Sequence, residues 1–169
     1  MGAAETGPVE VEGEGEFPQR GLFTAPTEYR VTARYANGVE MIMRNKPIED
    51  VEATTTGTTF FGSDGWVYVR YYAARASSPG LLKETIGADE IRLPVSNHHY
   101  RNFLDCVKTR QRPVAPVEHA HRTISVAHLG NIAMLLDRKV RWNPDTETCI
   151  DDATANRMLG RAMRSPWRL

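Results

Sequence analysis

Residues 29–43 read YRVTARYANGVEMIM, and this stretch decides the first half of the fold. Apolar and polar side chains alternate from Tyr29 to Tyr35, as in a strand with one buried and one wet face. Asn37 and Gly38 then turn the chain. A three-residue loop over 36–38, with Gly38 left-handed in a bulge, places apolar residues opposite apolar residues and polar residues opposite polar residues across the two strands. The predicted neighbours are Tyr35 with Val39, Ala33 with Met41, Val31 with Met43, and Arg34 with Glu40. A two-residue turn would mix apolar and charged residues on both faces, so the pattern favours the bulged hairpin.

The flanking segments also predict extended structure. Valine and glutamate alternate over residues 9–12, as in a short edge strand whose charges discourage pairing with a foreign strand. Residues 17–26 are a Gly/Pro-rich connector. A second hairpin is predicted over 58–71, turning at 63–65, and residues 73–94 are predicted to be a looser connection.

The hydrophobic period then changes from 2 to 3.6. Ser96 or Asn97 can cap a helix that ends near Arg110, and a longer helix is expected over 117–136. The apolar stripe of the first helix is Tyr100, Phe103, Leu104 and Val107. A short strand over 140–142 and a last helix from Asp151 or Asp152 to Leu159 should follow. Strands followed by helices predict an α+β fold with a largely antiparallel sheet.

The composition is typical of a folded domain, and the chain has no net charge that would create a long-range electrostatic field. The chain has 169 residues, 41% hydrophobic and 25% charged, with 21 basic and 21 acidic side chains. A net charge of zero argues against nucleic acid as a partner. The sequence contains no run of 18 apolar residues, so it does not predict a membrane span. No signal peptide is visible, and the two cysteines fit a reducing compartment, which favours the cytoplasm.

No sequence motif for a familiar reaction is present. The chain lacks G-x-G-x-x-G, the P-loop and the G-x-S-x-G elbow. His121 and His128 would lie about 10.5 Å apart along a helix axis, too far to share a metal ion without a third element such as His98 or His99. The competing interpretation is a polar helix stripe that packs against another part of the protein. That stripe comprises Glu118, His121, Arg122, Ser125, His128 and Asn131.

Aromatic residues gather on the second hairpin. Trp66, Tyr68 and Tyr71, with Tyr72 beside them, are candidates for a subunit interface, because Trp and Tyr combine apolar area with hydrogen bonding. Ordinary sheet core explains them equally well. A sugar-stacking platform is a weaker third interpretation.

Long ordered phrases of the sequence resemble one known family. They include HYRNFLDCVKTRQRPVAPVEHAHRTISVAHLGNIAMLLDRKVRW (99–142), NPDTE (143–147) and SPW (165–167). The phrases GPVEVEGEGEFP (7–18), YANG (35–38) and FFGSDGWVYV (60–69) are similar as well. From Gly7 onward the chain resembles the C-terminal part of bacterial Gfo/Idh/MocA oxidoreductases, the glucose-fructose oxidoreductase and inositol dehydrogenase superfamily.

The resemblance implies a two-domain parent enzyme. Its N-terminal Rossmann domain would hold NAD or NADP, and its C-terminal domain would supply an open sheet with helices on one face. That sheet would form one wall of the substrate site and the subunit interface. No catalytic, cofactor-binding or metal-binding residue of the family carries over onto this sequence, because the Glu-Lys-Pro segment and the paired histidine and aspartate of the family are missing. Residues 45–47, Asn-Lys-Pro, only echo the former.

We therefore expect residues 1–169 to form a single substrate-side and oligomerisation domain, with residues 1–6 a disordered or artificially added start. The parent would oxidise a sugar, cyclitol or related polyol in carbohydrate metabolism, and this chain alone would be inactive. Its partners would be the Rossmann domain, a second copy bound through the sheet, and the polyol substrate. The alternative is a stand-alone, non-catalytic carbohydrate-binding or dimerisation module.

Overall fold

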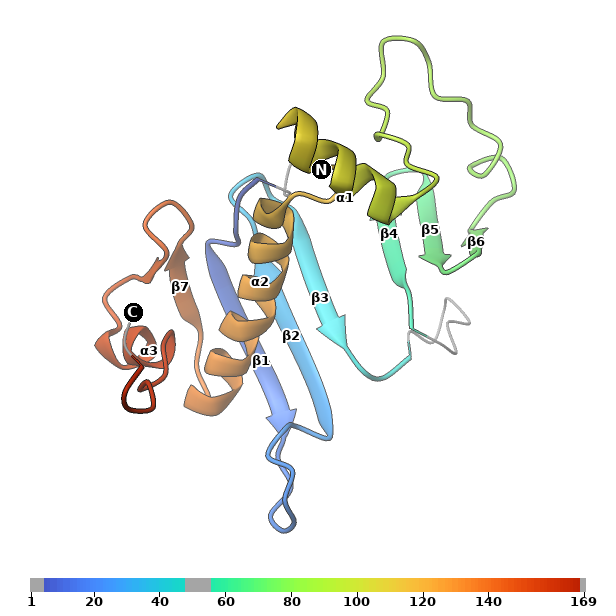
Figure 1. The fold of residues 1–169 in the computed structure, drawn as a ribbon. Helices are drawn as coiled ribbons and strands as arrows, with labels where there is room; N and C mark the ends of the chain where they lie inside the picture. Colours follow the sequence, from blue (N-terminus) through green and yellow to red (C-terminus); the bar gives the residue numbers. More distant parts are fainter. Residues whose placement is uncertain (1–4, 48–55, 168–169) are drawn as a thin grey trace. The chain divides into compact units, whose positions relative to one another are not determined.

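The computed structural model describes residues 5–47 and 56–167 (Figure 1). Along the chain the elements are β1 (Glu10–Glu16), β2 (Glu28–Arg34), β3 (Glu40–Arg44), β4 (Thr58–Gly62), β5 (Gly65–Arg70), β6 (Ala73–Ala76), α1 (His99–Thr109), α2 (Val117–Leu136), β7 (Val140–Asn143), β8 (Thr148–Cys149) and α3 (Ala153–Met158). In this part of the chain every strand pair is antiparallel, so the α+β prediction is confirmed. No helix within it is long and apolar enough to cross a lipid bilayer.

The chain divides into two compact units. The first comprises Met1–Asn45 and Cys106–Leu169, and the second comprises Lys46–Asp105. The first unit contains a five-stranded sheet in the order β3-β2-β1-β7-β8, together with α2 and α3. The second contains a three-stranded sheet in the order β4-β5-β6.

Strand β1 lies inside the first sheet, and its predicted place at an edge was wrong. It pairs with β2 along its whole length and with β7 at its start, where Glu10 lies opposite both Arg34 and Arg141. The alternation of valine and glutamate reports a strand with one buried face, but it does not report how many neighbours the strand has. The second neighbour, β7, lies more than 120 residues further along the chain, and no local sequence pattern predicts that pairing.

The β2–β3 hairpin has the predicted register. Ala33 lies opposite Met41, and Val31 lies opposite Met43. The Tyr35 N–H donates to the Val39 carbonyl at 2.9 Å. Gly38 adopts a φ of +84°, which is the left-handed conformation that the bulged turn requires.

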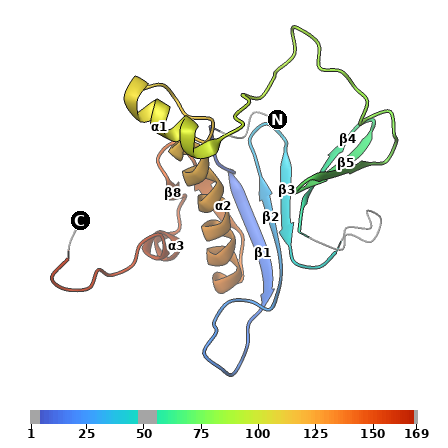
Figure 2. The ribbon, with the colours of Figure 1, turned by 45° about the vertical axis from the view of Figure 1, so that its right-hand side comes forward.

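Helix α2 lies along one face of the five-stranded sheet in both views (Figure 1 and Figure 2). Its bounds are those predicted, and the residue that caps its C-terminus, Asp137, has a left-handed φ of +49°. The buried core joins this helix to the sheet and to α3. It consists of Val11, Val31, Ala33, Val126, Leu129, Ile132, Ala133, Val140, Trp142, Cys149 and Ala155.

Two glycines allow α2 to approach the sheet closely. A Cβ atom on Gly130 would lie 2.8 Å from Val31 Cγ1, and one on Gly13 would lie 2.9 Å from Met134 Cγ. Non-bonded carbon atoms rest about 3.5–4.0 Å apart. Both glycines are therefore positions where the backbone of one layer touches a side chain of the other.

The helix caps were predicted in part. Asp152 caps α3 as expected, because its carboxylate accepts the Ala155 N–H at 2.9 Å. Neither Ser96 nor Asn97 caps α1. Instead His98 Nδ1 accepts the Arg101 N–H at 3.1 Å, since an imidazole nitrogen can replace the usual oxygen acceptor. The predicted apolar stripe of α1 is exposed.

The second unit extends the predicted hairpin by one strand. β4 and β5 join at Ser63 and Asp64, and Gly65 has a φ of +138°. Strand β6 was missed, because residues 73–94 were predicted to be a loose connection. Its sequence, Ala-Ala-Arg-Ala, lacks the β-branched and aromatic residues that mark strands, and its pairing with β5 defines it. Strand β8, of two residues, was missed for its shortness.

We expect Gly130→Ala to destabilise the first unit, although alanine is the better helix former by about 1 kcal/mol. The added methyl group would overlap the branched Val31 side chain. Overpacking of this kind typically costs roughly 1–3 kcal/mol, so urea unfolding should show a net loss of about 1 kcal/mol.

Gly160→Ala, which lies after α3, is the control for adding a methyl group in open space, because a Cβ there meets nothing within 4 Å. Adding Val31→Ala to Gly130→Ala should shrink the penalty that the new methyl group imposes. An unchanged or raised unfolding midpoint for Gly130→Ala would contradict the close packing of α2 on the sheet.

Candidate functional site

The face of the first sheet opposite α2 is polar, and we call it the polar face. Side chains alternate along a strand, and Val11, Gly13 and Val31 face the helix. The intervening residues of β1, β2 and β3 therefore project from the other face. They are Glu10, Glu12, Glu14, Arg30, Thr32, Arg34, Glu40, Ile42 and Arg44.

Arg34 is the centre of an ion network on the polar face. Its Nη1 lies 2.9 Å from Glu10 Oε1, its Nη2 lies 2.8 Å from Glu12 Oε1, and its Nε lies 3.1 Å from Glu40 Oε2. The Lys139 ammonium lies 2.8 Å from Glu10 and 3.7 Å from Glu12. The Arg34 guanidinium thus links β1, β2 and β3. Lys139, in the turn before β7, binds the same two carboxylates of β1.

The network shifts the proton affinity of its members. The hydrogen bond from Lys139, followed by that from Arg34, lowers the pKa of Glu10 from its ordinary value, although desolvation acts in the opposite direction. The same contact with Glu10 raises the pKa of Lys139. Hydrogen bonds to Glu12 and then Glu10 raise the pKa of Arg34. The charged forms therefore stabilise one another at neutral pH.

A hollow of about 210 Å³ lies beside this network. It is lined by Glu12, Gly13, Glu14, Arg30, Thr32, Asp137, Arg138 and Lys139. Arg30 Nη1 donates to Thr32 Oγ1 at 3.3 Å, and Thr32 is only 3% exposed, although the sequence placed it on a wet face. Carboxylates accept and cations donate hydrogen bonds, so this lining suits a ligand rich in hydroxyl groups.

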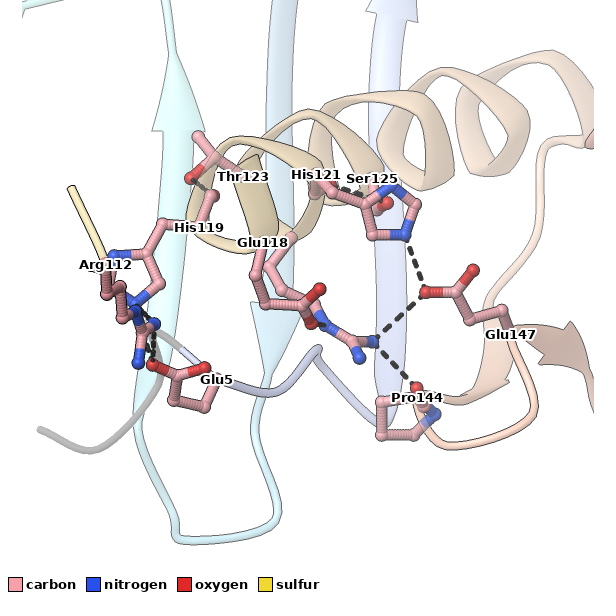
Figure 3. A network of polar contacts seen from close by, with 10 residues as sticks. Glu5, Arg112, Glu118, His119, His121, Thr123, Ser125, Pro144 and Glu147 are labelled. Atoms are coloured by element: carbon pink, nitrogen blue, oxygen red, sulfur yellow. Dashed lines mark hydrogen bonds and ion pairs between the residues drawn. The ribbon is translucent and has the colours of Figure 1, made fainter. Parts of the chain in front are cut away.

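The N-terminal half of α2 carries a second polar network (Figure 3). His121 Nε2 lies 2.6 Å from Glu147 Oε1. Arg122 bonds Glu118 at 2.7 Å, and its Nη1 donates to the Pro144 carbonyl at 2.8 Å and contacts Glu147 at 3.2 Å. These bonds fasten the start of the helix to the turn between β7 and β8.

Next to it, Glu5 contacts both Arg112 and His119 (Figure 3). The hydrogen bond with His119, followed by that with Arg112, lowers the pKa of Glu5. Residues 1–4 of the predicted disordered or added start lie outside the described residues. Glu5 is the first described residue, and these two contacts tie it to the region of α2.

The predicted polar stripe is only partly brought together. Ser125 Oγ donates to the His121 carbonyl at 2.8 Å, an ordinary bond within a helix. His128 is exposed one turn further on and takes part in neither network. In residues 5–47 and 56–167, no three histidine, cysteine, aspartate or glutamate side chains are grouped so as to hold a metal ion.

Comparison with protein families identifies the domain. The whole chain, residues 1–169, matches the model of the oxidoreductase family C-terminal alpha/beta domain of the Gfo/Idh/MocA type. This chain belongs to that family. No curated protein and no solved structure matches the chain significantly. A C-terminal domain of an oxidoreductase implies an N-terminal partner domain in the parent enzyme.

In this Gfo/Idh/MocA C-terminal domain, the aromatic interface candidates lie in the second unit. Tyr68 is buried, and its hydroxyl lies 3.5 Å from the Thr56 carbonyl. A Cβ on Gly57 would lie 2.4 Å from the Tyr68 ring, so the backbone of residue 57 covers that side chain. Trp66 is half-buried and Tyr71 is 90% exposed, which leaves these two within reach of a partner.

Sequence reasoning missed most of the polar-face network. It placed Arg34 beside Glu40, which the structure confirms, but it did not join Glu10, Glu12 or Lys139 to them. The pattern of charges along β1 and β2 could have predicted the network. Acidic residues recur at every second position from Glu10, whereas basic residues flank Thr32 on β2, and opposite charges pair across strands.

We expect Glu10→Gln to reduce the loss of folding stability that the unchanged chain shows as the pH falls. The pKa of Glu10 is lower in the folded chain than its ordinary value of 4.5. Its ionised form therefore contributes stability above about pH 4.5, and that contribution is lost as the pH falls through the folded pKa.

The measurement is the Tm between pH 3 and pH 7. Glu10→Gln should lower the Tm at pH 7 and have a smaller effect at pH 3. Glu16→Gln, at the exposed end of β1, should leave the profile of the unchanged chain intact. Equal losses of Tm at both ends of the pH range for Glu10→Gln would be inconsistent with the network.

Proposed function

We propose that this domain supplies the substrate-side wall of an NAD(P)-dependent oxidoreductase that acts on a sugar, cyclitol or related polyol. The polar face of the first sheet is the wall. The chain alone lacks catalysis, because the groups that hold the coenzyme and move the proton belong to the N-terminal partner domain. A further role is assembly of the parent into an oligomer.

The observation that carries the proposal is the asymmetry of the first sheet. One face is closed by α2 and an apolar core. The other carries three carboxylates of β1 opposite the cationic and hydroxyl groups of β2. Polyols are recognised by such mixed donor and acceptor sets, in which each hydroxyl group both donates and accepts.

The residues that the structure describes do not fit a nicotinamide dinucleotide. A dinucleotide needs a glycine-rich turn between a strand and a helix, where backbone amides meet the pyrophosphate. Gly13 and Gly15 lie within β1, and a Cβ on either would meet the Met134 side chain. Glu12, Glu14 and Glu16 surround them, and their charge repels phosphate.

The outer side of α2 is the proposed contact with the partner domain. Ile124, His128 and Leu135 are exposed on that side. Such a mixture of apolar and polar residues is typical of interfaces between domains of one chain. The polar face is then left to line the reaction chamber.

The test is calorimetric titration of the purified chain with NADH and NADPH. We expect no saturable binding below about 1 mM coenzyme. Saturable binding in the micromolar range would contradict the assignment of the coenzyme to another domain.

A second titration with myo-inositol and glucose separates this proposal from a stand-alone module. One wall of a chamber should bind these polyols weakly, with a Kd of about 1 mM or above. Micromolar binding by the chain alone would instead favour the carbohydrate-binding module.

A further inference from the structure

Strand β3 forms an edge of the first sheet, and its charged residues, Glu40 and Arg44, stand only at its two ends. Among the described strands it is paired with β2 alone. Edge strands are normally kept from pairing by shortness, by a bulge, by proline, or by charged side chains, of which lysine is the commonest. The opposite edge, β8, is only two residues long. β3 is five residues long, and its centre is Met41, Ile42 and Met43.

The backbone groups that β3 presents outward can be identified. The bond from the Tyr35 N–H to the Val39 carbonyl makes residues 35 and 39 a hydrogen-bonded pair. Such pairs alternate along an antiparallel ladder. Met41 and Met43 therefore bond to β2, whereas Glu40, Ile42 and Arg44 direct their N–H and C=O groups away from it.

The sequence of β3 is complementary to itself when reversed. In an antiparallel pair of two β3 strands centred on Ile42, Ile42 meets Ile42 of the other copy, and Met41 meets Met43. Glu40 meets Arg44 at both ends. Each of the three residues that present backbone groups outward meets another such residue, so one register satisfies the hydrogen bonds and the charges together.

Charges within the chain favour an acidic partner at Arg44. Arg44 lies directly opposite Arg30 on β2, and like charges in that position are destabilising. Among the described residues, neither arginine forms an ion pair with a carboxylate. Glu40 contacts Arg34 through Oε2 only, at 3.1 Å. The second carboxylate oxygen of Glu40 can therefore meet Arg44 of another copy.

We propose that two copies of this chain associate through their β3 edges, in antiparallel register about Ile42, to form one continuous ten-stranded sheet. The interface is isologous, with a two-fold axis between the two Ile42 residues. It rests on the oligomeric role proposed above and assigns that role to the β3 edge, in place of the Trp66 and Tyr68 face. Ile42 and Met41, 44% and 39% exposed in the single chain, become covered.

The first experiment reverses charges at the ends of the strand. Glu40→Lys places lysine opposite Arg44 of the other copy, and Arg44→Glu places glutamate opposite Glu40. Sedimentation equilibrium should show each single variant with a dimer Kd about tenfold weaker, and the double variant near the original value.

Two features of this series guard against misreading it. Arg44→Glu gives Arg30 an opposite charge across the strand, so its weakened association would not reflect a damaged fold. The Arg34–Glu40 contact is lost in Glu40→Lys and in the double variant alike, so rescue reports the contact between copies. Glu16→Lys, with the same charge change elsewhere, should leave the dimer Kd unchanged.

The second experiment places a cysteine on the two-fold axis. In a Cys106→Ser background, a short thiol-reactive cross-linker such as 1,2-ethanediyl bismethanethiosulfonate should link Ile42→Cys into a covalent dimer. Cα atoms of a hydrogen-bonded pair are about 5.5 Å apart, and their Cβ atoms are farther apart than in an unstrained disulfide, so a short spacer is used. Ile150→Cys, at a similarly exposed residue, should stay monomeric on a denaturing gel.

The outcomes separate this proposal from the function proposed above. A dimer that survives both single reversals, and in which Ile42→Cys does not link, overturns the β3 interface while an oligomeric role stands. A monomer at the highest attainable concentration overturns both. Protection of the Ile42 amide from hydrogen exchange that does not vary with protein concentration would show that the chain covers its own edge, and would also overturn the proposal.

Discussion

The close contact between α2 and the first sheet governs the rest of the structure. Gly130 and Gly13 bring the helix against Val31 and the β1 backbone, so that one face of the sheet is sealed by apolar side chains. Because strand side chains alternate, every residue that is not in this seal must project from the other face. The division into an apolar and a polar face is a direct consequence of that packing.

The polar face is held together by charge. Arg34 joins three strands through carboxylates on both sides of β2, and Lys139 extends the set toward β7. These contacts are partly solvated, and each contributes little to the free energy of folding by itself. Their effect is to fix the positions of donors and acceptors on a sheet face, which is the preorganisation that a substrate wall needs.

Features set by neighbouring residues were predictable from the sequence. The bounds of α2 follow from its hydrophobic period, and the β2–β3 register follows from matching faces around Gly38. Features set by distant residues were not. The central place of β1 depends on β7, which joins the sheet from the other end of the chain. The cap of α1 by His98 depends on the orientation of one ring nitrogen, which residue type alone does not specify.

The most direct test of this account is to map a polyol onto the chain by the NMR chemical shifts of its backbone amides. If the polar face is the substrate wall, increasing myo-inositol should shift the amides of Glu12, Glu14 and Thr32 together, and Arg30→Ala should abolish these shifts. Shifts confined to the α2 residues around His121, or to the aromatic hairpin of the second unit, would contradict the account.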